Sequence, residues 1–270
     1  MTARLQRRSM PMNCKGVLTA LCLAAGLTLG ASPKGQWVPL FDGKTLNGWQ
    51  TLRGEPATVT CWTVSDGVLW LNPKAGKRRG DIYTVKQYDD FILEFEWKIP
   101  PHGNSGVKYR MTWYGRSYLG PEYQIIADSK RDRSTLAHAK GATAALYDLI
   151  APDPASWFPK PEGRWNKGKI VARGSLIEHW LNGKLVVRVD LHSERFKKAH
   201  AASKFRKLPN FAQNPKGRIM LQDHGSKVCY RNIRIMELKA QASKPGEGTR
   251  FRKTSSAAAE QASPERACCR

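Results

Sequence analysis

Hydrophobic and polar residues alternate with a period of two along several short segments of this chain. In residues 91–99 (FILEFEWKI) every second residue is large and apolar, and Glu94, Glu96 and Lys98 lie between them. Such alternation predicts a strand that buries one face. Residues 62–71 predict a tight hairpin, because an Asp-Gly pair separates two apolar runs.

The second half of the chain continues this pattern. Residues 169–191 predict a meander of strands with two turns at Gly-containing pairs, and residues 217–225 and 228–238 predict the closing strands. The basic segment 192–211 indicates a loop or a short helix. Many short strands, Gly-rich turns and few helical patterns predict an all-β fold, a sandwich or jelly roll.

Residues 103–128 carry an unusual set of polar side chains on two predicted strands. The apolar side of the first strand is formed by Val107, Tyr109 and Met111. The opposite side and the next strand carry directional hydrogen-bonding groups, namely Arg110, Glu122 and Gln124, with Asp128 just beyond. Such groups suit a polyhydroxylated ligand, and a solvated sheet face is the competing interpretation.

The composition allows a large core and suggests partners. The 270 residues include nine Trp, eight Tyr and eight Phe, which can fill a core and also serve as sugar-stacking platforms. The formal net charge of +23 makes nucleic acid a first guess. However, the basic residues are spread along the chain and no nucleic-acid motif appears, so we expect no specific nucleic-acid partner. A long-range attraction toward an anionic polysaccharide or surface remains.

The N-terminus predicts export. Arg4, Arg7 and Arg8 precede an apolar run over residues 17–29 that ends in small residues, which is the order of a cleavable signal peptide. We therefore expect residues 1–31 to be removed and the mature chain to be secreted or periplasmic, without a membrane span. An uncleaved anchor is the alternative.

The C-terminal residues 240–270 are rich in Lys, Ser, Ala and Gly and show no apolar period. This composition predicts a disordered tail, because it offers too little apolar surface to bury. One domain over residues 37–238 remains between the predicted signal peptide and the tail.

Outside the signal segment the chain has four cysteines, Cys61, Cys229, Cys268 and Cys269. An exported chain can form disulfides, and Cys61 and Cys229 lie in an early and in the last predicted strand. A bridge between them and two buried free thiols are both compatible with the sequence. The spacings fit no zinc site and no acidic loop requires calcium, so we expect neither a metal nor a cofactor.

Several motifs follow one another in order between residues 37 and 238. They are FDGK and LNGW (41–49), WTVSDGVL (62–69), YDDF (88–91), GNSG (103–106), GPEYQ (120–124), RWN (164–166), EHWLNG (178–183), SKF (203–205) and LQDHG (221–225). Together they resemble the 3-keto-disaccharide hydrolase domain family, long catalogued as a domain of unknown function. The resemblance implies a concanavalin-A-like jelly roll, export and action on sugars, but no individual substrate.

A 3-keto sugar would turn glycoside cleavage into an elimination. The ketone acidifies the hydrogen on C2, a base removes it, the enolate expels the group on C1, and water adds to the enone. Such a site needs a base, a cation or donor for the enolate oxygen, and an acid for the leaving oxygen. We expect Glu122 as the base, Arg110 at the enolate oxygen and His224 as the acid or oxyanion donor. For Arg110, an ion pair that only orders the sheet is the alternative.

Other residues are assigned supporting roles. His179 is a second candidate for catalysis, although its alternation with apolar neighbours indicates the core. Asp223 alternates with the apolar residues of its strand, so we expect it to be a buried structural residue or one that orients His224. The expected sugar-binding residues, besides Arg110, are Asn104, Gln124, Asp128, Trp180, Lys204 and Gln222.

Two classes of function follow. The first is an exported carbohydrate-active hydrolase or lyase that cleaves 3-keto-glycosides or related oligosaccharides. The alternative is a non-catalytic, lectin-like module that binds glycans through aromatic and amide side chains. An ordinary glycosidase would need two facing carboxylates, and Glu122 with Asp128, Glu94 or Glu96 could supply them.

Overall fold

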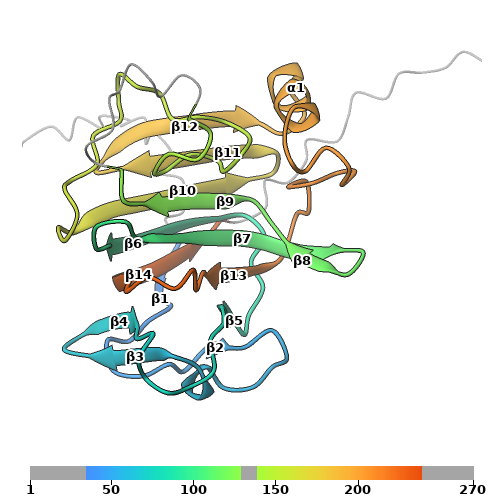
Figure 1. Ribbon diagram of the computed structural model, residues 1–270. Coiled ribbons are helices and arrows are strands. Elements are labelled where there is room, and N and C mark those ends of the chain that lie inside the picture. Colours follow the sequence, from blue (N-terminus) through green and yellow to red (C-terminus); the bar gives the residue numbers. More distant parts are fainter. Residues whose placement is uncertain (1–34, 129–138, 239–270) are drawn as a thin grey trace, which may run out of the picture. The chain divides into compact units, whose positions relative to one another are not determined.

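The computed structural model describes residues 35–128 and 139–238, which form two antiparallel β-sheets with short helical connections (Figure 1). The predicted signal peptide and disordered tail, with Cys268 and Cys269, fall outside these residues. None of the helices within the described ranges combines the length and the apolarity needed to cross a membrane.

Sheet A contains eight strands. In spatial order they are β12 (Lys184–Asp190), β11 (Leu176–Leu181), β10 (Asn166–Arg173), β6 (Phe91–Lys98), β14 (Cys229–Glu237), β4 (Val68–Leu71) and β3 (Trp62–Ser65), with β1 (Trp37–Pro39) beside β14. The strand predicted at 91–99 is the central strand β6, and the predicted meander is β10–β11–β12. Both predictions are confirmed.

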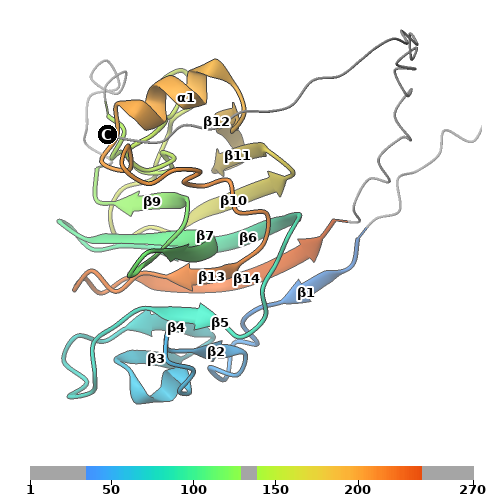
Figure 2. The same ribbon diagram turned by 90° about the vertical axis from the view of Figure 1, so that its right-hand side faces the viewer.

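Sheet B contains six strands. They are β2 (Trp49–Gln50), β5 (Ile82–Thr84), β13 (Arg218–Leu221), β7 (Asn104–Tyr114) and β8 (Ser117–Leu119), with β9 (Glu122–Ile126) beside β7. The helical connections are the 3₁₀ turn η1 (Ala57–Val59) and the helix α1 (Glu194–Ala201), which lies beside β12 (Figures 1 and 2). Ser193 caps α1 by accepting a hydrogen bond from the Phe196 amide at 3.2 Å, so the basic segment contains the short helix.

Side chains from the facing sides of the two sheets form one core. Phe95 of β6 meets Tyr123 of β9 edge-to-face, with 5.3 Å between ring centroids. Such a pair contributes about 0.5–1.5 kcal/mol beyond its buried area. The Tyr123 hydroxyl donates to the Trp180 carbonyl of β11 at 3.1 Å, which ties the sheets together. Two antiparallel sheets over a shared core are the jelly-roll sandwich that the sequence predicted.

The predicted hairpin turns have the backbone geometry that their sequences favour. Asp66 and Gly67, between β3 and β4, have φ angles of 50° and 72°, and Asn182 and Gly183, between β11 and β12, have 49° and 85°. Positive φ at both central residues is what a type I′ hairpin needs, and Asn, Asp and Gly tolerate it best.

Cys61 and Cys229 are both buried and free, so of the two alternatives the pair of thiols is correct. The Cys61 thiol donates to the Lys77 carbonyl at 2.9 Å. Cys229 lies in β14 opposite Trp70 of β4. The two thiols therefore act as small packing groups, Cys229 in β14 and Cys61 just before β3.

A β-bulge in β7 changes which side of sheet B its residues face. Met220 of β13 pairs with Lys108, whereas Arg218 pairs with Met111, so β7 has one residue more than β13 in this interval. The extra residue is Arg110, with a φ of 46°. Gly217 makes the close approach feasible, because a Cβ there would lie 2.4 Å from the Arg110 carbonyl carbon.

The bulge turns Arg110 into the interior and corrects its predicted role at the enolate. Arg110 is 2% exposed. Its guanidinium donates to the Asp89 carbonyl at 3.1 Å, the Gly174 carbonyl at 2.7 Å and the Asp90 carboxylate at 2.8 Å. With these partners Arg110 joins β7 to the end of sheet A where β6 begins and β10 turns into β11. Past the bulge, Met111 moves to the side where Lys108 lies, against the predicted alternation.

His179 belongs to the core, which corrects its assignment as a catalytic candidate. The ring is fully buried, its Nε2 shares a 2.9 Å hydrogen bond with the Tyr109 hydroxyl, and its Nδ1 lies 3.1 Å from the Ala144 carbonyl. Burial lowers the pKa of the imidazole from 6.5 to about 4. A neutral ring with no exposed atom links strands and does not reach a substrate.

This pKa predicts a loss of stability in mild acid. As pH falls below 6.5 the unfolded chain takes up a proton at His179, while the folded chain resists until about pH 4. The free energy of unfolding should therefore fall by up to about 3 kcal/mol across this window. Urea unfolding at several pH values measures it. In His179→Gln the slope should be smaller, and in the exposed control His192→Gln it should not change; equal slopes in all three proteins would contradict the assignment.

Candidate active site on sheet B

The outward face of sheet B carries a row of side chains that runs across its strands. Glu122 of β9 pairs with Lys108 of β7, Lys108 with Met220 of β13, and Met220 with Tyr83 of β5. The next row on the same face contains Gln124, opposite Gly106, and Gln222, whose amide donates to the Gly106 carbonyl at 3.0 Å. Strands far apart in sequence, β5, β7, β9 and β13, lie in this one sheet (Figure 1) and carry these side chains.

Glu122 is the central group of this face. It is 7% exposed, and its Oε2 lies 3.6 Å from Nζ of Lys108. With the Gln124 amide turned so that its nitrogen faces Glu122, the amide donates to Oε1 at 3.2 Å. Burial raises the pKa of the carboxyl above its ordinary value of 4.5, against the opposing pull of Lys108 and Lys204. A carboxylate whose pKa is raised in this way is a stronger base than an exposed one.

Gly106 leaves the space that Glu122 occupies. A Cβ at position 106 would lie 2.3 Å from Oε1 of Glu122 and 3.0 Å from its carboxyl carbon. The side chain of Glu122 therefore lies across the neighbouring strand, beside Lys108. Any larger residue at 106 would displace the carboxylate.

The outer edge of β9 is fixed by the segment that follows it. The Tyr147 amide donates to the Glu122 carbonyl at 3.1 Å, and the Ala144 amide donates to the Gln124 carbonyl at 2.8 Å. The Lys204 amide donates to Asp148 at 2.7 Å, and its ammonium lies 4.1 Å from the centre of the Tyr147 ring. Lys204 thus comes near Glu122, as its predicted position beside the site requires.

Asp81 and Tyr83 lie on the opposite side of Lys108 and were missed by the sequence reasoning. Asp81 Oδ1 accepts from the Asp223 amide at 2.8 Å, and the Tyr83 hydroxyl lies 3.4 Å from Oδ2. Burial raises the pKa of the Asp81 carboxyl above 3.8, and Lys108 opposes this effect. In the sequence, the spacing of two residues places Asp81 and Tyr83 on the same side of a strand. Only the pairing of β5 with β13 shows that this side faces the site.

Of the three groups predicted to meet, Arg110 does not join Glu122. Arg110 lies in the interior, and His224 lies in an exposed turn after β13. This turn meets β7 at Asn104, whose amide donates to Ser226 at 3.1 Å. The Glu122 carboxylate lies over Gly106, two residues of β7 from that point. Within residues 35–128 and 139–238 no hydrogen bond or ion pair joins His224 to Glu122.

Asp223 is a hydrogen-bonded structural residue, and its carboxylate also accepts from the Gly225 amide at 2.9 Å, in the turn that carries His224. Its carboxylate forms an ion pair with Arg79, whose Nε donates to Oδ2 at 2.7 Å, and it accepts from the Gly80 amide at 2.8 Å. These bonds lower the pKa of the Asp223 carboxyl. The Asp223 carboxylate thus orders both the residues that lead into Asp81 and the turn of His224, so the two predicted roles stay open.

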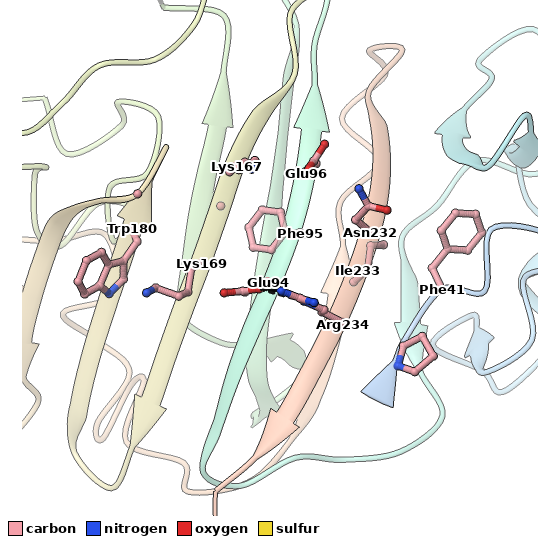
Figure 3. Close-up of a pocket in the computed structure, with 13 residues that line it drawn as sticks. Phe41, Glu94, Phe95, Glu96, Lys167, Lys169, Trp180, Asn232, Ile233 and Arg234 are labelled. Atoms are coloured by element: carbon pink, nitrogen blue, oxygen red, sulfur yellow. Dashed lines mark hydrogen bonds and ion pairs between the residues drawn. The ribbon is translucent and has the colours of Figure 1, made fainter. Parts of the chain in front are cut away.

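The remaining predicted sugar contacts are distributed over different parts of the molecule. Asn104 has the parity of the outward face but lies at its far end, beside the turn of His224. Asp128 is buried and accepts from the Thr143 amide at 2.9 Å. Trp180 lies on the outward face of sheet A, the opposite side of the sandwich from Glu122 (Figure 3).

The pairing of Glu122 with Glu94 or Glu96 that an ordinary glycosidase could use does not occur. Glu94 and Glu96 are on the outward face of sheet A, where they form ion pairs with Arg234 and Arg231 (Figure 3 shows both Glu). They cannot face Glu122 across one sugar. Within residues 35–128 and 139–238, no three side chains of His, Cys, Asp and Glu gather as a metal site would require.

Comparison with known proteins agrees with this architecture. The sequence profile of the 3-keto-alpha-glucoside-1,2-lyase-like domain matches residues 36–236. A protein of Bacteroides thetaiotaomicron named 3-keto-disaccharide hydrolase is 31% identical over 230 residues, which cover 75% of this chain and 78% of that protein.

Two crystal structures of Parabacteroides distasonis proteins, each described as a candidate glycosyl hydrolase, are also similar. The first has 31% identity and a TM-score of 0.64, covering 75% of this chain and 94% of the other. The second has 26% identity and a TM-score of 0.54, covering 75% and 100%. On the match of the profile over most of its length, this chain belongs to the family of the 3-keto-alpha-glucoside-1,2-lyase-like domain.

Proposed function

We propose that this chain is a carbohydrate-active enzyme that cleaves 3-keto-glycosides on the outward face of sheet B. The family membership and the name of the Bacteroides relative support the class of substrate. The observation that carries the proposal is the buried Glu122 carboxylate, held beside Lys108 on an outward face. Burying an ionisable group costs free energy, and a module that only binds sugars does not need such a group.

The first step in this proposal is removal of the C2 proton by Glu122. Burial raises the pKa of this carboxyl, which makes it a stronger base than an exposed Glu. The electron pair of the C–H bond moves toward the ketone and gives an enolate. Lys108, 3.6 Å from Glu122, is the cation that would stabilise the enolate oxygen, the role that the sequence analysis had given to Arg110.

The second step is expulsion of the group on C1. The enolate reforms the ketone as the C1–O bond breaks, and the leaving oxygen takes a proton. Asp81 is our candidate for this acid, because burial raises its pKa and helps it to keep a proton. The product at this stage is an enone. Addition of water at C1, with return of a proton to C2, completes a net hydrolysis.

Elimination and direct hydrolysis differ in what happens at C2. Elimination exchanges the C2 hydrogen with solvent, whereas a direct displacement by water leaves it in place. Turnover in deuterium oxide, followed by mass spectrometry of the released 3-keto sugar, distinguishes the two. The proposed mechanism requires one deuterium on C2.

We further propose that the protein works outside the cytoplasm. The support is the sequence of residues 1–31 alone, with its basic start, apolar centre and small residues at the end. A disaccharide or glycoside substrate is compatible with such a location.

Replacing Glu122 by Gln should abolish turnover of a 3-keto-disaccharide without unfolding the domain. Loss of the base should lower kcat by ~10²–10⁴. The measurement is release of 3-keto-hexose, with the unoxidised parent disaccharide as a substrate control and the exposed Glu237→Gln as a matched variant. Retained turnover in Glu122→Gln would move the base elsewhere. Glycan binding by the native protein without any turnover would favour the lectin-like alternative.

Replacing Lys108 by Met should both slow the reaction and change its pH dependence. Lys108 lowers the pKa of Glu122, so its loss should raise that pKa. Because Glu122 must be ionised to act as the base, the acid limb of kcat/KM should shift to higher pH. The profile of the exposed Lys207→Met should match that of the native enzyme. If the acid limb of Lys108→Met does not shift, Lys108 does not affect the pKa of the base, which would contradict the proposal.

A further inference from the structure

The outward face of sheet A has two adjacent hollows, on the other side of the sandwich from Glu122. The first, of about 620 Å³, extends from Trp180 on β11 to Phe41 beyond β14 and crosses β10 and β6 (Figure 3). The second, of about 410 Å³, includes Trp70 of β4. Both reach β6, where Glu96 lines the first and Lys98, two residues further along the strand, lines the second.

Charged side chains cross this face in two parallel rows. In one row Lys169, Glu94 and Arg234 follow one another across β10, β6 and β14 (Figure 3), and in the other Lys167, Glu96 and Arg231 do so. Arg234 and Arg231 pair with Glu94 and Glu96, with Nη2 to Oε2 distances of 2.6 and 2.8 Å. Each row therefore has a cation on either side of one carboxylate.

Half-buried tryptophans accompany these cations. The Lys169 ammonium lies 3.8 Å from the centre of the Trp180 ring. The Arg231 guanidinium lies 4.1 Å from the Trp165 ring, and the Lys227 ammonium lies 4.6 Å from the Trp70 ring. Aromatic surfaces and cations thus alternate from the first hollow to the second.

Cross-strand pairing explains part of this arrangement, but not its charge. Pairs such as Glu94 with Arg234 stabilise neighbouring strands. Lys167 and Lys169 form no ion pair with any described carboxylate, and both line the first hollow. The two hollows together are lined by five cations and three carboxylates, namely Lys98, Lys167, Lys169, Lys227 and Arg234 against Asp66, Glu94 and Glu96.

We propose that the outward face of sheet A binds an anionic polysaccharide that carries carboxylate groups. The tryptophans provide flat surfaces on which the apolar faces of sugar rings stack, and the excess cations match the acidic groups. Two hollows that both reach β6 suit an extended chain of sugars better than a single small molecule. The site is independent of the proposed catalytic site, because it lies on the other sheet.

Calorimetric titration of the full-length protein with polygalacturonate oligosaccharides tests this proposal. Neutral malto-oligosaccharides of the same length and duplex DNA serve as the other ligands. Lys167→Gln/Lys169→Gln should weaken polygalacturonate binding by about tenfold. Trp180→Ala should weaken it to a similar extent, and Trp180→Phe should retain most of it because a ring remains. Circular dichroism and thermal melting confirm that each variant is folded.

The matched control is Lys197→Gln/Lys198→Gln, which removes the same charge from the exposed surface of α1. The proposal expects this variant and Glu122→Gln to bind polygalacturonate within about twofold of the native protein. An equal loss in both lysine pairs would show a general effect of net charge and overturn the proposal. Binding of duplex DNA as tight as that of polygalacturonate, or tighter binding of the neutral oligosaccharides, would also overturn it.

Discussion

The proposed site depends on one interaction, between the buried carboxylate of Glu122 and the ammonium of Lys108. Glu122 loses its water, and the resulting rise of its pKa is limited by Lys108. The arrangement needs a strand with no side chain at position 106, since Glu122 occupies that space. It also needs the segment after β9, which fixes the backbone of Glu122 through Tyr147. Local chemistry here is thus a consequence of sheet geometry.

The bulge in β7 also decides which side chains reach the site. One extra residue reverses the alternation, so that Arg110 joins the core and Met111 moves outward. Because the Arg110 guanidinium faces inward, it does not reach the proposed site. It links β7 to the start of β6 in sheet A through Asp90. Removing one partner of such a pair leaves a poorly compensated charge, which typically costs about 3–5 kcal/mol for a fully buried pair.

Most of the fold could be predicted from the sequence, because alternation and turn residues are local signals. The strand at 91–99, the meander and the Asp66–Gly67 hairpin all follow from them. The site was predicted only in part. Glu122 and Gln124 share a face as their spacing requires, whereas the bulge at Arg110 depends on the approach of Gly217 from a distant strand. Non-local pairing of this kind leaves no periodic signal along the chain.

The central claim is that Glu122 is a buried carboxylate whose environment shifts its acidity. A pH titration of its carboxyl carbon by ¹³C NMR, assigned by the signal that disappears in Glu122→Gln, measures this directly. The account predicts a pKa above the ordinary value of 4.5. A pKa at or below 4.5 would contradict it, because the carboxylate would then be as well solvated or as well paired as one on an exposed surface.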